Sequence, residues 1–175
     1  VRDHIARVIP GFDGFNDKID IPGGFYLGNA ARDRQWRTDG HKARFTVAAI
    51  PRLGLPDGQL RLMTLRSHDQ YNTTVYDLND RYRGIKGDRH VVFMNAYDIE
   101  QRGLSAGQLV DLTSHFADGK QRTAKRFKIV AYPITPGCMA GYFPELNVLI
   151  SVKSFADRSR TPTSKFIPVS LSPSA

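Results

Sequence analysis

The fold of this chain depends on the segment Leu60-Arg-Leu-Met-Thr-Leu-Arg-Ser-His-Asp-Gln-Tyr-Asn-Thr-Thr-Val-Tyr76. Its first six residues form a mostly apolar run of strand length. From Thr64 to Thr74 almost every side chain can donate or accept a hydrogen bond. A polar loop at the end of an apolar strand holds such groups on a fixed base, as many binding sites do. On composition alone, a solvated surface loop is an equally good interpretation.

Composition describes an ordinary globular protein that favours an acidic partner. The 175 residues fit one domain, or one domain with an appendage, and the net charge is +8 with a pI near 9.8. We expect the partner to be nucleic acid, an anionic cofactor or an acidic protein face. The single cysteine, Cys138, excludes an internal disulfide and fits a reducing, cytoplasmic setting. We expect no membrane span and no signal peptide, and because residue 1 is Val, we expect a fragment of a longer chain.

The first part of the chain is predicted to be irregular. Proline and glycine punctuate residues 1–40, and scattered aromatic residues indicate packing on a following or partner domain. Residues 43–50 have the composition of a strand. We therefore expect a connector over 1–57, the main domain over 58–171 and a frayed tail over 172–175.

The remaining elements are mostly strands separated by turns. Asn95 is a plausible N-cap for a short helix that ends before Gly103, and Pro168 indicates an edge strand or a bulge. Residues 133–141, with two prolines and two glycines, are predicted to form a loop. Beyond the first strand, strands are predicted at 90–94, 108–116, 120–132, 146–152 and 166–171, with 108–132 forming a β-hairpin. This pattern favours a closed β-barrel with short helices over a doubly wound sheet.

Residue patterns for catalysis are weak. The five histidines lack zinc-finger spacing, no nucleophile elbow or phosphate loop is present, and no metal ligand or catalytic residue is assigned. Residues 120–128 form a basic stretch beside Phe127, which is typical of some nucleic-acid-binding proteins. The solvated face of a strand is the favoured interpretation of that stretch.

Several motifs nevertheless follow one another in a specific order. They are Thr64-x-Arg66 with the Gln70–Thr73 loop, Asn95-x-x-Asp98, Gly103-Leu104 leading into the hairpin, Glu145–Leu149, and Thr161-Pro162-x-x-Lys165. Together, over about residues 58–171, they resemble the C-terminal molybdopterin-dinucleotide-binding domain of the DMSO reductase superfamily. The similarity is greatest to its formate-dehydrogenase-like branch of oxidoreductases. Residues 36–45 resemble the segment that leads into this domain from the catalytic domains.

The resemblance implies a six-stranded double-psi β-barrel that binds bis(molybdopterin guanine dinucleotide) carrying molybdenum or tungsten. Leu65 stands where the family usually has glycine. Asn147 and Lys165 are implied to lie near the pterin or a phosphate, and the loop residues near the phosphate, ribose or guanine groups. The implied cofactor-binding residues are Thr64, Leu65, Arg66, Ser67, Gln70, Tyr71, Asn72, Thr73, Asn147 and Lys165.

The resemblance also implies that different domains of the full-length protein have different roles. The metal ligand and any iron–sulfur cluster would belong to preceding catalytic domains, and Cys138 takes neither role. This domain would hold the dinucleotides, and alone it is expected to be inactive, because the redox chemistry belongs to the cofactor. The alternative function is a basic β-barrel module that binds nucleic acid through residues 120–128, which is the less favoured partner.

Overall fold

The computed structural model describes residues 1–50, 54–72 and 75–175, and the chain divides into two compact units, Val1–Pro51 and Arg52–Ala175. The first unit contains two short helices, α1 (Arg2–Val8) and α2 (Phe15–Lys18), where an irregular segment was predicted. Arg2 Nε donates to Asn16 Oδ1 at 2.7 Å and joins the two helices. None of the helices in the described part of the chain is long and apolar enough to cross a membrane.

The strand predicted at 43–50 was wrong. Residues 43–50 have no regular structure, and Phe45 is 97% exposed. Strand composition is insufficient by itself, because a strand's backbone donors and acceptors need a neighbouring strand. The expected domain boundary after residue 57 stays a prediction.

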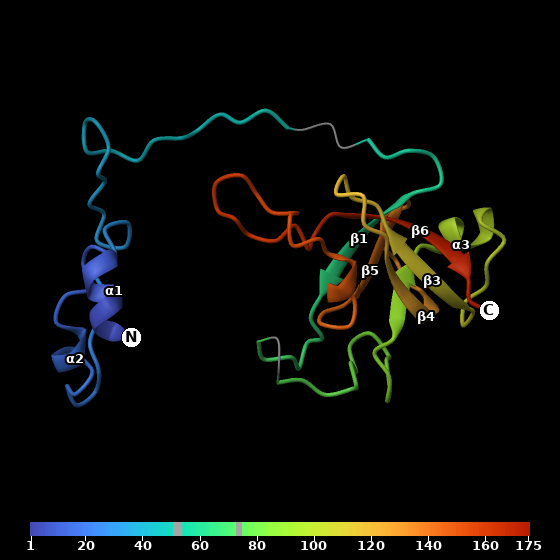
Figure 1. Cartoon of the computed structure of the whole chain (residues 1–175), viewed down its shortest axis with the longest axis horizontal. Helices are drawn as coiled ribbons and strands as arrows, with labels where there is room; N and C mark the ends of the chain where they lie inside the picture. Colours follow the sequence, from blue (N-terminus) through green and yellow to red (C-terminus); the bar gives the residue numbers. More distant parts are fainter. Residues whose placement is uncertain (51–53, 73–74) are drawn as a thin grey trace. The chain divides into compact units, whose positions relative to one another are not determined.

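The second unit is a closed barrel of six strands in the order β1-β5-β2-β4-β3-β6 (Figure 1). The strands are β1 (Leu60–Leu65), β2 (Val91–Met94), β3 (Leu109–Ser114), β4 (Arg122–Ala131), β5 (Cys138–Tyr142) and β6 (Ile167–Pro173). The pairs β1–β5 and β2–β4 are parallel, and all other neighbours are antiparallel. The predicted mainly β fold with a closed six-stranded barrel is confirmed, whereas the double-psi detail stays a prediction.

Side chains that alternate between buried and more exposed positions along the strands form the core. In β1, Leu60, Leu62 and Thr64 are buried, as their period of two predicts. Strand β2 is buried on both faces, because Val92 and Met94 join the barrel core while Val91 and Phe93 join a second apolar cluster around Tyr142. Short continuous apolar runs such as this one are typical of strands covered on both sides.

The region between β4 and β6 corrects two predictions. Strand β5 lies where a loop was predicted, and the strand predicted at 146–152 is instead a single 3-10 turn, η1 (Asn147–Leu149). Leu146 and Leu149 enter the core from this turn with the i, i+3 spacing of a helix. A Cβ at Gly141 would lie 2.2 Å from Leu146 Cδ1, so glycine in β5 makes room for the turn.

The last strand also differs from expectation. Pro168 pairs with Arg61 of β1, and its carbonyl accepts a hydrogen bond of 2.9 Å from the His115 N–H. It therefore lies within a closed barrel and not at an edge. Strand β6 runs to Pro173, and the Ser174 N–H donates to the Leu109 carbonyl at 3.0 Å, so the frayed tail was wrong for these residues.

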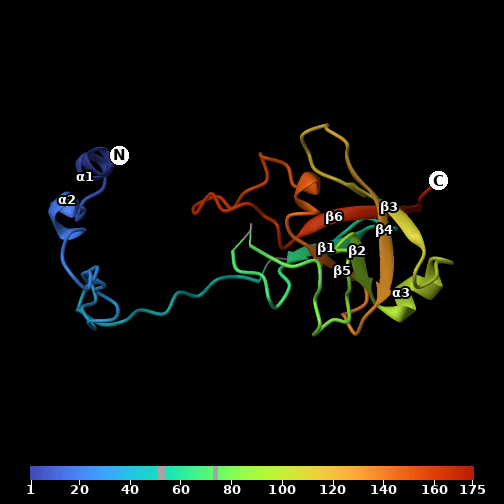
Figure 2. The same ribbon diagram turned by 90° about the horizontal axis from the view of Figure 1, so that it is seen from below.

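Strand directions place the long connections together. The segments 66–90, 115–121 and 143–166 all leave or enter the barrel at the end where β1, β3 and β5 finish. Helix α3 (Ala96–Gln101), capped by the Asn95 side chain as predicted, lies at the opposite end with the C-terminus (Figures 1 and 2). Consequently, all described residues of the predicted site lie at or near one end of the barrel.

Candidate functional site

Thr64 and Lys165, two of the residues predicted for the site, contact each other at the end of β1. The backbone N–H and the hydroxyl of Thr64 both donate to the Ser164 carbonyl, at 2.9 and 3.0 Å. Lys165 Nζ donates to the Thr64 carbonyl. Thr64 is buried, so its polar groups hold the 143–166 connection against the strand.

Arg66 follows the strand directly and is exposed. Within the described residues, its guanidinium has no hydrogen-bond or ion-pair partner, while its backbone carbonyl accepts a bond of 3.2 Å from Arg83 Nη1. The preceding Leu65 carbonyl accepts from the Phe143 N–H at 2.9 Å. Arg66 is thus an exposed cation without a partner in the described part of the chain, on backbone whose carbonyl groups are held by hydrogen bonds, which suits it to bind an anion.

Ser67 and Gln70 are buried, and both contact Arg89. Arg89 Nη1 donates to Ser67 Oγ at 2.8 Å, and Arg89 Nη2 donates to Gln70 Oε1 at 2.9 Å. Gln70 Nε2 in turn donates to the Phe143 carbonyl at 3.0 Å. These two predicted site residues thus direct their polar groups inward.

Arg89 is the central group of this buried network, with 1% of the residue exposed. Its Nε donates to Glu145 Oε1 at 2.7 Å, and its Nη2 also donates to the Phe143 carbonyl at 3.0 Å. The guanidinium lies 4.2 Å from the ring centroid of Tyr76 and 4.4 Å from that of Tyr142. Burial of this charge is tolerated because a carboxylate, hydrogen bonds and two aromatic faces replace water.

Sequence reasoning missed Arg89, which lies just before the strand predicted at 90–94. Its position between Asp88 and His90 gives no indication of burial, because both neighbours are exposed. The only trace of its role was Glu145, which appeared in the family motif without an assigned partner.

A second network lies next to the first. Asp80, 1% exposed, accepts from Arg83 Nη1 at 2.6 Å and from the Tyr142 hydroxyl at 2.8 Å, and His68 Nδ1 lies 3.4 Å away. Burial opposes ionisation of Asp80, but the bonds from Arg83 and Tyr142 outweigh it and lower its pKa. Burial and the hydrogen bond to the Asp80 carboxylate raise the pKa of Tyr142, which stays protonated and donates.

The other predicted site residues are solvent-facing. Tyr71 is 78% exposed, with its N–H bonded to the Val75 carbonyl at 2.8 Å, and Asn72 is exposed in the left-handed backbone region. Thr73 lies outside the described residues. Asn147 is exposed at the start of η1 and lines a pocket with Phe155 and Arg160. No hydrogen bond that the structure describes joins the Asn147 side chain to residues 64–72.

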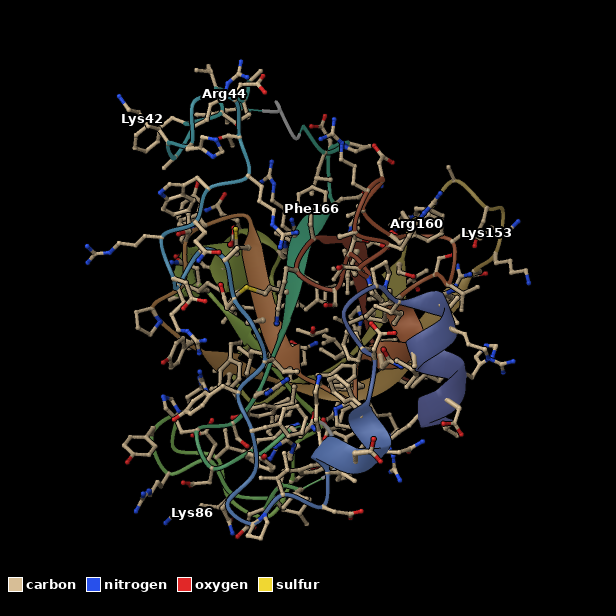
Figure 3. The ribbon with its side chains drawn as sticks, turned by 90° about the vertical axis from the view of Figure 1, so that its left-hand side faces the viewer. Lys42, Arg44, Lys86, Lys153, Arg160 and Phe166 are labelled. Atoms are coloured by element: carbon tan, nitrogen blue, oxygen red, sulfur yellow. The ribbon has the colours of Figure 1, made fainter. Side chains whose placement is uncertain are left out.

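Further cations surround this end of the barrel. Figure 3 shows Lys86 at the bottom of the view, on the 66–90 connection, and Lys153 and Arg160 at the right, on the 143–166 connection. All three are exposed, and Arg160 lies 4.7 Å from the Phe155 ring centroid. Basic side chains on two connections create a positive potential around the barrel end.

The basic strand proposed for nucleic acid is built differently. Phe127, 2% exposed, is part of the core and is not available to stack on a base. Arg122 Nη2 is paired with Asp118 Oδ2 at 2.6 Å, and hydrogen bonds from Arg122 and Ser151 lower the pKa of Asp118. Lys125 and Lys128 are exposed on β4, whereas Lys120 lies on the connection before it and lines a surface pocket with Phe116.

The residues described in the structure offer no resident metal site. Among them, no group of three or more His, Cys, Asp or Glu side chains could hold a metal ion. The chemistry of the barrel end is therefore that of hydrogen-bond donors and cations, which suits phosphate and a polar heterocycle.

Comparison with known proteins places the chain in one family. Residues 60–168 match the family described as the molydopterin dinucleotide binding domain. The whole chain is 50% identical to uncharacterized oxidoreductases of Mycobacterium tuberculosis and Mycobacterium bovis, and 99% of it aligns at 41% identity with Protein YdeP of Escherichia coli. It spans 23% and 24% of the lengths of these curated relatives. The chain therefore belongs to the molybdopterin-dinucleotide-binding domain family.

Proposed function

We propose that this chain is the cofactor-holding C-terminal domain of a molybdenum-dependent oxidoreductase. The observation that carries the proposal is Arg66, whose guanidinium has no partner among the described residues and follows β1 on backbone held by Arg83. A fixed guanidinium can bind phosphate through two parallel charge-assisted bonds. The pyrophosphate of a molybdopterin guanine dinucleotide is such a ligand, and the match to the binding-domain family supports it.

The proposed contacts fall into two groups. Exposed groups would touch the cofactor: Arg66 and Lys165 the phosphates, Tyr71 and Asn72 the ribose or guanine, and Asn147 the pterin or a phosphate. Thr73, which lies outside the described residues, is also proposed for the ribose or guanine. Lys165 already donates to the Thr64 carbonyl, and an ammonium group keeps further donors for a second acceptor. Buried groups would support them, because Thr64, Ser67 and Gln70 use their polar atoms inside the protein.

The role of this domain is to bind and orient. When bound, the cofactor supplies a molybdenum or tungsten centre for electron transfer, and the protein residues hold its dinucleotide tails. In the proposed full-length protein, preceding domains would supply the metal ligand, any iron–sulfur cluster and the substrate site. We further propose two bound dinucleotides, a formate-dehydrogenase-like reaction, a cytoplasmic location and an isolated domain without activity.

The nucleotide released from the full-length protein tests the proposal. Hydrolysis of the bound cofactor should release GMP, detected by chromatography and mass spectrometry at two GMP for each metal ion, because two dinucleotides are proposed to share one metal. An adenine or cytosine nucleotide, or protein with metal but no nucleotide, would contradict it. Oligonucleotide binding by the same preparation that GDP does not compete with would favour the nucleic-acid alternative.

A further inference from the structure

Arg89 connects the two long segments that meet at the barrel end. From its position just before β2, it bonds to Ser67 and Gln70 on the 66–90 connection and to Phe143 and Glu145 on the 143–166 connection. Each of the three guanidinium nitrogens has at least one partner. One side chain thus fixes the residue after Arg66 relative to the turn that follows β5.

Arg89 cannot itself bind a ligand at this end. It is 1% exposed, and its charge is paired with Glu145 at 2.7 Å. Its effect on the site must therefore pass through the groups it holds. The most direct connection from Arg89 to the site passes through Ser67. Arg89 donates a hydrogen bond of 2.8 Å to the Ser67 side chain, and Ser67 directly follows the exposed Arg66 in the chain.

A second path leads from Arg89 to the same residue. Arg89 stacks on Tyr142, the Tyr142 hydroxyl donates to Asp80, and Asp80 pairs with Arg83. Arg83 Nη1 then donates to the Arg66 carbonyl at 3.2 Å. Both paths end on the backbone of the residue assigned to the phosphate.

We propose that Arg89 is the positioning residue of this site, which fixes the Arg66 backbone so that its guanidinium meets the cofactor pyrophosphate in bidentate geometry. This inference rests on the proposed function. Lysine cannot replace Arg89, because a single ammonium nitrogen cannot reach acceptors on both segments in the planar arrangement of a guanidinium. Bidentate recognition depends on geometry, so a small displacement of the Arg66 backbone reduces affinity while leaving the barrel folded.

A double-mutant cycle in the full-length protein tests this role. The variants are Arg66→Ala, Arg89→Lys and the double variant, and the readout is the rate of cofactor release, followed by the fluorescence of the oxidised pterin. Each single variant should release cofactor about tenfold faster or more, whereas the double variant should be within about threefold of Arg66→Ala alone. This non-additivity is expected because Arg89 acts through Arg66, and loss of stability alone would not produce it.

Arg122→Lys is the matched control. Arg122 is also an ion-paired arginine at this end of the barrel, but it holds Asp118 and Ser151, and no hydrogen bond or ion pair joins it to the described residues of the 66–90 connection. It should release cofactor at the wild-type rate. If Arg89→Lys does not fold, Glu145→Gln replaces it in the cycle; it weakens the hold on Arg89 and should give a several-fold effect with the same non-additivity.

The outcomes separate the two proposals. If Arg66→Ala releases cofactor quickly but Arg89→Lys does not, or if their effects multiply to about a hundredfold, the positioning role is overturned and the site remains. An equal effect of Arg122→Lys also overturns it. If Arg66→Ala has no effect on release, the placement of the site fails, and the inference fails with it.

Discussion

The Tyr142 hydroxyl donates a hydrogen bond of 2.8 Å to the buried carboxylate of Asp80. Tyr142 also provides an aromatic face for Arg89, so one side chain at the end of β5 connects the two charged networks beneath the site. A substitution that removes the Tyr142 hydroxyl and keeps the ring separates the contribution of the Asp80 hydrogen bond to stability from that of the aromatic contact with Arg89.

Tyr142→Phe should destabilise the barrel by about 1.5–3 kcal/mol, since it removes a bond to a charged, buried acceptor. The measurement is the free energy of unfolding in urea. Tyr97→Phe is the control, because Tyr97 lies on α3 and is exposed. Equal effects of the two substitutions would show that the Asp80 bond contributes little.

Asp118 and Arg122 of the β3–β4 hairpin form an ion pair that is hydrogen-bonded to Ser151, after η1, and we call these contacts the clamp. Acid should weaken this clamp. Bonds from Arg122 and Ser151 lower the pKa of Asp118 in the folded state. Because the folded pKa lies below the unfolded value of about 3.9, the stabilisation is complete above that pH and is lost as pH falls through the folded pKa. Asp118→Asn should therefore reduce stability at neutral pH and make the decline below about pH 4 less steep.

Urea unfolding at a series of pH values between 7 and 2 checks this expectation. Asp157→Asn supplies the control, as Asp157 is exposed in the 143–166 connection. An Asp118→Asn variant with the wild-type acid profile would exclude the clamp as a source of the pH dependence.

Gly141→Ala should destabilise the barrel through overpacking. The new Cβ would lie 2.2 Å from Leu146 Cδ1 and 3.1 Å from the Val91 carbonyl oxygen. Leu146 is fully buried, so relief requires movement of the core, at about 1–3 kcal/mol. At Gly54, where no atom of the described residues other than its chain neighbours lies within 4 Å of the added Cβ, alanine should be close to neutral in the same thermal-unfolding measurement.

The predictable parts of the fold are those set by local pattern. The alternation of Leu60, Leu62 and Thr64 and the Asn95 cap depend on residues close in sequence, and both are confirmed. The strand at Cys138–Tyr142 was not predicted, because small residues and a glycine are more typical of a loop. The reason for a glycine in this strand is the packing of Leu146 against Gly141, which only the tertiary structure shows. A short apolar run such as 146–152 does not distinguish a strand from a helical turn.

The site was predictable only in part, for a related reason. The position of Arg66 after an apolar strand identified the cation at the barrel end. Burial of Ser67 and Gln70 could not be foreseen, because it depends on Arg89, which lies 22 and 19 residues further along the chain. A charged residue in a polar loop is ordinarily solvated, and only the tertiary arrangement of Glu145 and the two tyrosines makes its burial favourable.

The barrel should fold without its cofactor. All six strands contribute side chains to one apolar core, and the strands pair with one another around the closed barrel. A fragment of residues 54–175 should therefore give a dispersed heteronuclear NMR spectrum. Poor dispersion throughout the fragment would show that the cofactor or preceding domains are needed to complete the core.

Arg66 should be the costliest single loss for cofactor retention. Its guanidinium is exposed and unpaired among the described residues, on backbone held by Arg83. Bonds to charged groups contribute about 1.5–3 kcal/mol, so Arg66→Ala should weaken cofactor binding about ten- to a hundredfold. Arg66→Lys should recover only part of the affinity, since an ammonium group cannot reproduce the planar fork.

Lys125→Ala separates this local effect from net charge. Lys125 is exposed on β4, so its loss changes the charge by the same amount away from the barrel end. The measurement is the molybdenum and GMP content per mole of purified full-length protein. A long-range electrostatic contribution depends on the net charge and only weakly on the position of the charge. If Lys125→Ala lost as much cofactor as Arg66→Ala, the effect of Arg66 would not be local. That result would place the cofactor's phosphates elsewhere and strengthen the case for the basic strand.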